Sequence, residues 1–257
     1  MNSVDLTKKS IFVFDKDDTI TSTKSAIGSS MAELLSDLSQ DKFVVIISGS
    51  AWDILQSQII DLLPNNINKP HWLFLPSGGS QLYQWQDDQL VKVYDHAIDQ
   101  SEFTKIKTLT LDALNKLAEA DKPEKIYSEQ VEYRGGQITL SALGQTAPKD
   151  KKVAWDPDRR KRQQMADWLR PQLSEYDVKV GGSTSIDITL HGINKEYGVR
   201  QVLQKLDMSP NDAVYFGDSL EPGGNDAIVK NIHNLDVFAV DSEQDTKKVL
   251  QSYLSKN

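Results

Sequence analysis

Three carboxylates stand within four positions near the N-terminus of this 257-residue chain, in the run Asp15-Lys16-Asp17-Asp18. They follow Ile11-Phe12-Val13-Phe14, an apolar run that predicts a strand buried on both faces. Acidic side chains gathered past the end of such a strand repel one another, and they suit a divalent cation placed between them. Cation and carboxylate together suit phosphoryl transfer, because the cation neutralises both the nucleophile and the phosphate.

A structural interpretation of the same segment stays open at this point. Asp and Thr side chains are typical of turns and of helix N-termini, so residues 15–21 could simply cap the next helix.

Three further polar segments lie where ligands bind in open α/β sheets. Ser48-Gly49 follows an apolar run at 43–47, and its hydroxyl and neighbouring amides could hold phosphate oxygens. Lys195 begins a predicted helix, where cation and helix dipole both favour an anion. The segment 217–226 adds carboxylates and a Gly-Gly pair. Each segment alone is weak evidence for a ligand site, since Ser-Gly is usually a turn and a lysine at a helix start is usually solvated.

The elements that must position these residues alternate between strand and helix at both ends of the chain. Apolar runs predict parallel strands at 11–14, 43–47, 72–75, 213–216 and 237–240. Between these ends, residues 126–143 alternate like an exposed sheet. We therefore expect an α/β parallel-sheet core, residues 1–84 plus 188–257, split around an α+β insert at 85–187.

Composition limits the partners. A net charge of −8 argues against nucleic acid and anionic membranes. The absence of cysteine excludes thiolate catalysis and Cys-ligated metal. The N-terminus lacks the apolar stretch of a signal peptide, and no apolar run approaches the roughly 20 residues that span a bilayer. A cytoplasmic enzyme is the expectation.

Taken together, the four segments resemble the motifs of the haloacid-dehalogenase (HAD) phosphohydrolase superfamily. These motifs are Asp-Lys-Asp-Asp-Thr, Ile-Ile-Ser-Gly-Ser, Asn194-Lys195 and Gly-Asp-Ser-x-x-Pro-Gly-Gly-Asn-Asp. The insert resembles the type-IIB (C2b) cap, which chooses the substrate. Within that class, residues 131–144 and 181–188 are similar to cap segments of the eukaryotic-type phosphomannomutase branch.

This resemblance implies residue roles. Asp15 would be the nucleophile that forms an aspartyl phosphate, and Asp17 would be the general acid and base. The remaining implied roles are Mg²⁺ binding by Asp15, Asp17 (through its carbonyl), Asp218, Asn225 and Asp226, phosphate binding by Ser48, Gly49 and Lys195, and sugar-phosphate contacts by Lys24, Arg134, Ser185 and Asp187. The branch commonly dimerises through its cap, so both a monomer and a cap-mediated homodimer stay open.

Departures from the mutase pattern bear on the reaction. A mutase needs a strong site for the phosphate that is not transferred, and arginine suits it. Here Gln145 and, in a less certain alignment, Lys152 stand where that branch carries arginine, Lys24 replaces another arginine, and Asp18 replaces a glycine. We therefore expect a sugar-phosphate phosphatase. Phosphomannomutase or phosphoglucomutase activity is the close alternative, and a non-catalytic sugar-phosphate sensor is a remote one.

The connection 149–162 is basic, with seven basic residues against three acidic ones. It could recruit an anionic sugar phosphate, although a solvated charged face is the more ordinary interpretation.

Overall fold

The computed structural model describes residues 4–181 and 185–256, with the backbone alone described at Lys149. The chain forms two compact units, Met1–Asp95 with Asn194–Asn257, and His96–Ile193. The boundaries expected from the sequence, 84/85 and 187/188, would cut through strands β4 (Gln81–Gln86) and β9 (Ile186–Leu190). Each strand stays with its own sheet, which moves the two boundaries toward the C-terminus.

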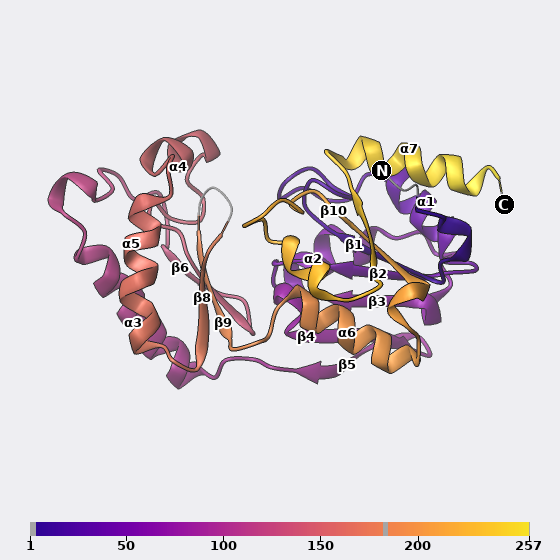
Figure 1. Cartoon of the computed structure of the whole chain (residues 1–257), viewed down its shortest axis with the longest axis horizontal. Helices are drawn as coiled ribbons and strands as arrows, with labels where there is room; N and C mark the ends of the chain where they lie inside the picture. The colour runs from indigo at the N-terminus through magenta and orange to yellow at the C-terminus, as the bar shows by residue number, and fades with distance from the viewer. Residues whose placement is uncertain (1–3, 182–184, 257) are drawn as a thin grey trace. The chain divides into compact units, whose positions relative to one another are not determined.

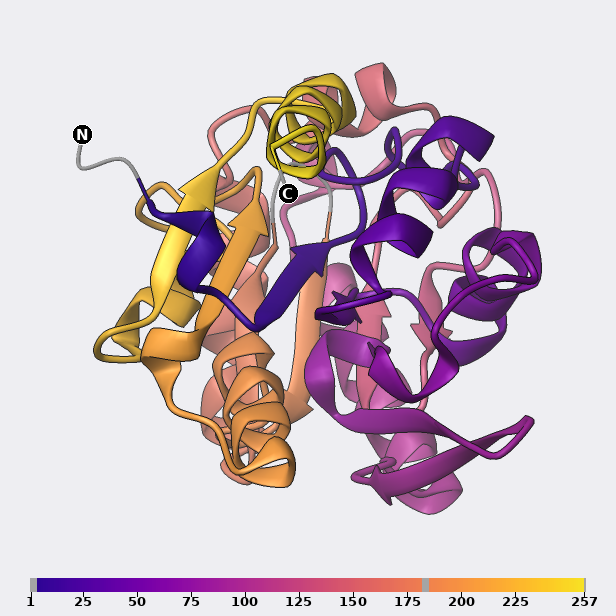
Figure 2. The ribbon, with the colours of Figure 1, turned by 90° about the vertical axis from the view of Figure 1, so that its right-hand side faces the viewer.

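A seven-stranded sheet in the order β11-β10-β1-β2-β3-β4-β5 forms the first unit. Its parallel strands are β1 (Ile11–Asp15), β2 (Phe43–Ile47), β3 (Trp72–Leu75), β10 (Ala213–Gly217) and β11 (Asp236–Ala239). In Figure 2 the indigo β1 lies beside the orange β10, with the yellow β11 beyond it. The apolar runs at these positions therefore form the expected parallel sheet.

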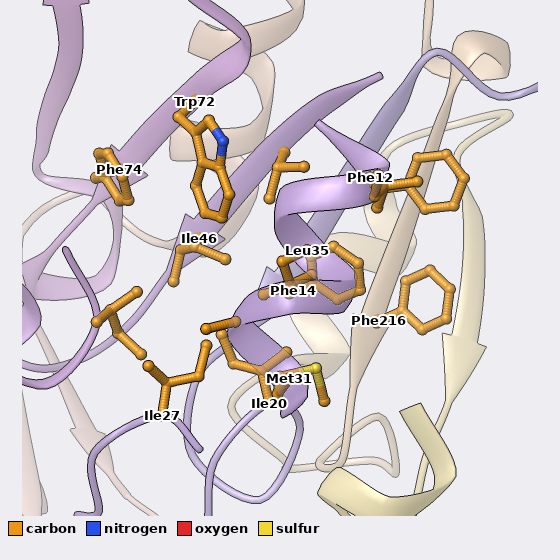
Figure 3. Packing of buried hydrophobic residues seen from close by; sticks show 14 of the residues in the cluster. Phe12, Phe14, Ile20, Ile27, Met31, Leu35, Ile46, Trp72, Phe74 and Phe216 are labelled. Carbon is orange, nitrogen blue, oxygen red and sulfur yellow. The ribbon is translucent and has the colours of Figure 1, made fainter. Parts of the chain in front are cut away.

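Helices cover both faces of this sheet because its strands are apolar on both sides. The helices of this unit are α1 (Ser29–Leu38), α2 (Trp52–Gln58), α6 (Lys195–Leu206) and α7 (Glu243–Leu254). On one face Phe12, Phe14 and Phe216 pack with Met31 and Leu35 of α1, as Figure 3 shows. On the other face, Val13 and Tyr215 cluster with Val199 and Val202 of α6.

A polar hairpin extends this sheet beyond β3. Strand β4 pairs antiparallel with β3 and with β5 (Gln89–Asp95). Its sequence, Gln-Leu-Tyr-Gln-Trp-Gln, alternates like the exposed strands of the insert. For this reason the boundary predicted between core and insert, at 84/85, lies inside this strand. Helix α2 ends at Gln58, because Ile59 breaks it with φ −124° and ψ −64° before a short 3₁₀ turn.

The second unit is an antiparallel sheet with helices, as expected for the insert. Its strands run in the order β6-β7-β9-β8, with β6 at Val131–Tyr133, β7 at Gln137–Leu140 and β8 at Tyr176–Val180. Its helices are α3 (Gln100–Asn115), α4 (Lys149–Trp155) and α5 (Arg160–Leu169). Helices α3 and α5 lie side by side along the sheet in Figure 1. Strand and helix side chains share one apolar core, which includes Ile106, Ile138, Met165, Val178 and Ile188.

Among the described residues, no helix combines the length and the apolar composition that crossing a membrane requires.

Candidate active site

The register of three parallel strands gathers the predicted residues at one edge of the sheet. Strand β1 lies between β2 and β10, with Asp15 opposite Ile47 and Phe14 opposite Phe216. The residues that follow these strands, among them Ser48 and Asp218, therefore leave the sheet next to Asp15. This is the carboxyl-end edge where open α/β sheets bind ligands.

Three carboxylates converge at this edge. Asp15, Asp218 and Asp226 each offer one oxygen atom, and these atoms lie within 4.8 Å of one another. Asp15 is 4% exposed and Asp226 is fully buried. All three donors are hard carboxylate oxygens, the ligand type that Mg²⁺ prefers, so the donor set fits this ion.

Lys195 is the cation of the cluster. Its Nζ lies 2.7 Å from Asp15 Oδ1 and 2.6 Å from Asp226 Oδ1. Within this group one ammonium faces three carboxylates, which leaves a negative charge that a divalent cation would offset. Lys195 is also the first residue of α6, whose N-cap is the side chain of Asn194, accepting from the Tyr197 amide at 3.1 Å.

A glycine pair allows the first turn of α6 to lie this close to the sheet edge. A Cβ placed on Gly198 would lie 2.9 Å from Gly79 Cα, and one on Gly79 would lie 3.0 Å from the Asn194 carbonyl oxygen. Gly79 also has φ +92°, a conformation that side chains disfavour. Backbone contact at this point therefore sets the position of Lys195.

Burial and mutual repulsion shift the titration of these acids. The pKa of Asp15 is raised to about 7, chiefly by burial and also by the charges of Asp226 and Asp218, while Lys195 opposes the shift. The pKa of Asp218 is raised by burial and by the charge of Asp226. Burial alone would lower the pKa of Lys195, but Asp15 and Asp226 outweigh it and raise that pKa.

Asp17 makes its own set of contacts. Its Oδ1 accepts from Lys16 Nζ at 2.9 Å and from the Lys24 backbone amide at 2.6 Å. The three-carboxylate cluster consists of other residues, and the role implied for Asp17 at the metal used its backbone carbonyl. The Asp17 carboxylate is therefore separate from the three-carboxylate cluster.

The helix-capping interpretation of residues 15–21 is wrong. Helix α1 begins after Gly28, whose position makes no side-chain capping bond. The carboxylate of Asp18 instead binds Thr23, with Oδ1 2.9 Å from the amide, and Asp18 itself adopts φ +58° in the turn.

The loop after β10 holds Asp226 in place. A Cβ on Gly217 would lie 2.7 Å from Asp226 Oδ2, so this glycine makes room for the carboxylate. The Ser219 amide donates to Oδ2 at 3.2 Å, and the Tyr215 hydroxyl donates to Oδ1. Asn225, the residue before Asp226, is exposed.

Ser48, Gly49 and Lys24 occupy the loops around the same edge. Ser48 is 1% exposed; its Oγ accepts from the Ser50 amide at 3.1 Å. A Cβ on Gly49 would have no neighbour within 4 Å, which leaves space beside its backbone. Lys24 is exposed, with φ +58°.

In the second unit, Asp187 organises the predicted substrate residues. It accepts from Thr139 Oγ1 at 2.9 Å and from Ser185 Oγ at 3.3 Å. Burial raises the pKa of Asp187, and the nearby charge of Arg134 opposes the shift. Arg134 also binds Glu132 Oε2 at 2.7 Å. Residues 182–184 of the segment 181–188 lie outside the described residues.

Two of the positions that depart from the mutase pattern, Gln145 and Lys152, make hydrogen bonds within this unit. Gln145 Nε2 donates at 3.1 Å to the carbonyl oxygens of both Gln130 and Thr139. Lys152 is 5% exposed, and its Nζ donates to the Gln145 carbonyl oxygen at 2.9 Å.

The basic connection is only partly a solvated face. Arg162 is buried, pairs with Asp156 at 2.8 Å and donates to the Gly181 carbonyl oxygen at 2.8 Å. Arg160 is exposed and binds Asp121.

Sequence reasoning missed three residues that contact these groups. No role was predicted for Lys16, because a lysine between two acids in the sequence is usually a solvated charge. Tyr215 and Thr139 lie inside strands, where a single residue carries no signal of its partner. The alternation of β10 gives the only hint, since it places Tyr215 on the α6 face that carries Lys195.

Comparison with known proteins yields one family. A family model described as eukaryotic phosphomannomutase matches residues 31–256. Phosphomannomutase 2 of Dictyostelium discoideum is 27% identical over 259 residues, which cover 97% of this chain and 98% of the relative. A probable phosphomannomutase of Caenorhabditis elegans is 24% identical over 253 residues, covering 96% of each chain.

Solved structures share the fold. The N-terminally truncated, IMP-bound IMP-nucleotidase of Plasmodium falciparum superposes with a TM-score of 0.67 at 14% identity, over 97% of this chain and 68% of the other. A trehalose-6-phosphate phosphatase related protein gives a TM-score of 0.60 at 15% identity, over 96% and 98%. These structures support the fold class that the sequence predicted, a HAD-like α/β fold.

Proposed function

We propose, from the premise that this chain belongs to the eukaryotic phosphomannomutase family of HAD-type phosphotransferases, that it transfers the phosphoryl group of a sugar phosphate to water. The contact of Lys195 with both Asp15 and Asp226, within the three-carboxylate cluster, carries this proposal. It places a buried carboxylate nucleophile beside an ammonium that can also hold a phosphate oxygen.

Asp15 attacks phosphorus and forms an aspartyl phosphate, while the ester oxygen departs. Attack by a carboxylate is effective when the reacting atoms are held in line and the charge of the phosphate is offset. Lys195, the Ser48 hydroxyl and the amide of Gly49 bind the phosphoryl oxygens. Asp17 protonates the departing oxygen and later deprotonates the water that releases phosphate from Asp15.

Mg²⁺ fits the donors at this edge. Asp15 and Asp218 would hold it together with the Asp17 carbonyl, and Asp226 and Asn225 would position the loop or a bound water. The ion supplies charge neutralisation when nucleophile and phosphate approach each other.

The cap residues decide between hydrolysis and mutase activity. A mutase binds its sugar phosphate in two orientations and needs a firm site for the second phosphate. Here the Gln145 amide is committed to two backbone carbonyls, and Lys152 is buried against a third. Neither offers the bidentate anion site of an arginine, which favours water as the acceptor. Arg134, Ser185, Asp187 and Lys24 then remain as proposed sugar-phosphate contacts.

Phosphomannomutase activity is the second candidate. It is favoured by relatives of that name that match nearly the full length of this chain. The two reactions share the aspartyl phosphate and differ in the acceptor. A non-catalytic sensor is disfavoured, because the family is enzymatic and both Asp15 and Asp17 are in place.

Mannose 1-phosphate, Mg²⁺ and a catalytic amount of a hexose bisphosphate separate the candidates. We expect free phosphate to accumulate, and we expect EDTA or Asp15→Asn to lower its release by at least about 10³-fold, the scale of losing a nucleophile. Accumulation of mannose 6-phosphate without free phosphate would establish the mutase instead. A panel of other sugar phosphates, scored for both products, identifies the substrate.

A further inference from the structure

Lys16 is a buried cation between the two proposed catalytic acids. Its side chain is fully buried, and its Nζ lies 2.9 Å from Asp17 Oδ1. Burial of an ammonium is costly unless a partner compensates it, so an apolar residue would be the simpler choice at this position. The ion pair therefore indicates a task for Lys16 beyond packing.

The two oxygens of Asp17 differ in their surroundings. Oδ1 accepts both the Lys16 ammonium and the Lys24 amide, at 2.9 and 2.6 Å. Across residues 4–181 and 185–256 no hydrogen bond reaches Oδ2, and the Asp17 side chain is 34% exposed. A proton on Oδ1 would collide with two donors, whereas Oδ2 can carry one and face solvent or substrate.

The turn itself does not depend on the ammonium. The Lys16 carbonyl oxygen accepts the amides of Ile20 and Thr21 at 3.0 and 3.1 Å, and the Asp18 amide donates to the Thr21 carbonyl at 2.7 Å. These backbone bonds close the turn whatever side chain stands at position 16. The Lys16 side chain thus acts on Asp17 and not on the turn.

We propose that Lys16 is a positioning residue that fixes the Asp17 carboxyl so that Oδ2 holds the transferable proton. This inference rests on the proposed function of Asp17 as general acid. As the Asp15 carboxylate forms its bond to phosphorus, the phosphorus–oxygen bond to the leaving group breaks. The proton moves from Asp17 Oδ2 to the departing oxygen, and the Asp17 carboxylate left behind faces the Lys16 ammonium.

Two aryl phosphates test the proposal through their leaving groups. Phenolate is a poor leaving group that needs a proton, whereas 2,4-dinitrophenolate leaves without one. The value of kcat/KM covers only the steps up to loss of the leaving group, so it excludes the later hydrolysis of the aspartyl phosphate. We expect Lys16→Met to lower kcat/KM for phenyl phosphate by about tenfold to a hundredfold, and that for 2,4-dinitrophenyl phosphate by less than about threefold.

Lys9→Met is the matched control. Lys9 is another buried lysine of this unit, 5% exposed, and it pairs with Asp236 at 2.6 Å near the start of β1, at the opposite end of that strand from Asp15. We expect its loss to change both kcat/KM values by the same factor. Lys16→Gln, which keeps a neutral N–H donor, is measured alongside Lys16→Met and should fall between it and the wild type; thermal melting confirms that each variant is folded.

The outcomes separate the inference from the proposed function. If Asp17→Asn discriminates between the two substrates and the Lys16 variants do not, the role of Lys16 is overturned while the proposed function stands. If Lys16→Met lowers both values equally, its role is structural and the proposal is overturned. If the wild type releases phosphate from neither substrate, the proposed function fails and this inference with it.

Discussion

Neighbouring acids on one sheet can titrate in opposite directions when their surroundings differ. Burial raises the pKa of Asp187 on β9 above its ordinary value. For Asp177 on β8, burial acts in the same direction, but Lys179, the Gly192 amide and His191 outweigh it and lower the pKa. The two carboxyl groups therefore make opposite contributions to the pH dependence of folding.

The substitutions Asp187→Asn and Asp177→Asn should reveal these contributions. A raised pKa means that Asp187 favours folding below its unfolded value, about 3.9, and loses that contribution as pH rises through the folded value. Asp187→Asn should therefore gain stability relative to the wild type as the pH rises above about 4. A lowered pKa reverses the sign and moves the window below the unfolded value: Asp177 stabilises the fold above about pH 3.9 and loses that contribution as pH falls through the folded value, so Asp177→Asn should lose stability relative to the wild type as pH rises toward about 4.

Urea unfolding of both variants and the wild type at several pH values measures this difference. Parallel pH profiles for the two variants would contradict the assignment.

The site residues that the structure brings together are those that a sequence motif marks. Asp15, Asp218, Asp226 and Lys195 lie at strand ends or at a helix start, where apolar runs and polar residues alternate visibly. Their convergence follows from the parallel register. The partners of Asp17 and Asp187, Lys16 and Thr139, could not be predicted in this way, because side-chain pairing depends on rotamers and on the turn geometry.

At the scale of elements, those marked by a local sequence pattern were likewise predictable, and those placed by long-range pairing were not. Strands buried on both faces were predictable because their apolar runs have no other stable location. The hairpin β4–β5 was not, because its alternating pattern fits any half-exposed sheet. Its place was decided by pairing with β3, Leu73 opposite Gln84 and Phe74 opposite Tyr83, which is a long-range choice that local sequence does not encode.

The contact between Gly198 of α6 and Gly79 predicts a coupling between packing and activity. Gly198→Ala places a methyl group 2.9 Å from Gly79 Cα and forces the first turn of α6 away from the sheet edge. We expect a loss of about 1–3 kcal/mol in stability and a lower kcat/KM, because Lys195 moves with the helix.

Denaturant unfolding and phosphatase assays on the same preparation measure both effects. Gly28→Ala is the control, since its added methyl would meet only side-chain atoms, at 3.8 and 4.0 Å. Equal losses in the two variants would show that the glycine contact is not responsible.

At the scale of the molecule, the two units have separate hydrophobic cores. The clusters around Phe14 and around Val13 belong to the first unit, and the cluster around Ile138 belongs to the second. The candidate catalytic residues, Asp15 to Asp226, all lie in the first unit, whereas Arg134, Ser185 and Asp187 lie in the second. The proposed roles therefore place the chemistry in the first unit and the choice of substrate in the second.

Replacement of residues 96–193 by a short Gly-Ser linker tests this division. We expect the remaining chain to fold and to retain hydrolysis of 2,4-dinitrophenyl phosphate, while its preference among sugar phosphates is lost. Thermal melting and the substrate panel measure the two results. Preserved sugar selectivity in the shortened chain would contradict the assignment of specificity to the second unit.

The two points where the chain leaves and re-enters the first unit are fastened to each other. Tyr94, one residue before the first crossing, meets Tyr197 edge to face with ring centroids 5.9 Å apart, and its hydroxyl donates to the Gly79 carbonyl oxygen at 2.8 Å. The two ends of the second unit, residues 96–193, are thus held together by contacts between residues of the first unit. Because the entropy cost of closing a loop grows only slowly with its length, the first unit loses little stability by carrying so long an insertion. Replacing residues 96–193 by another insertion would leave the ammonium group of Lys195, two residues before Tyr197 on α6, in place.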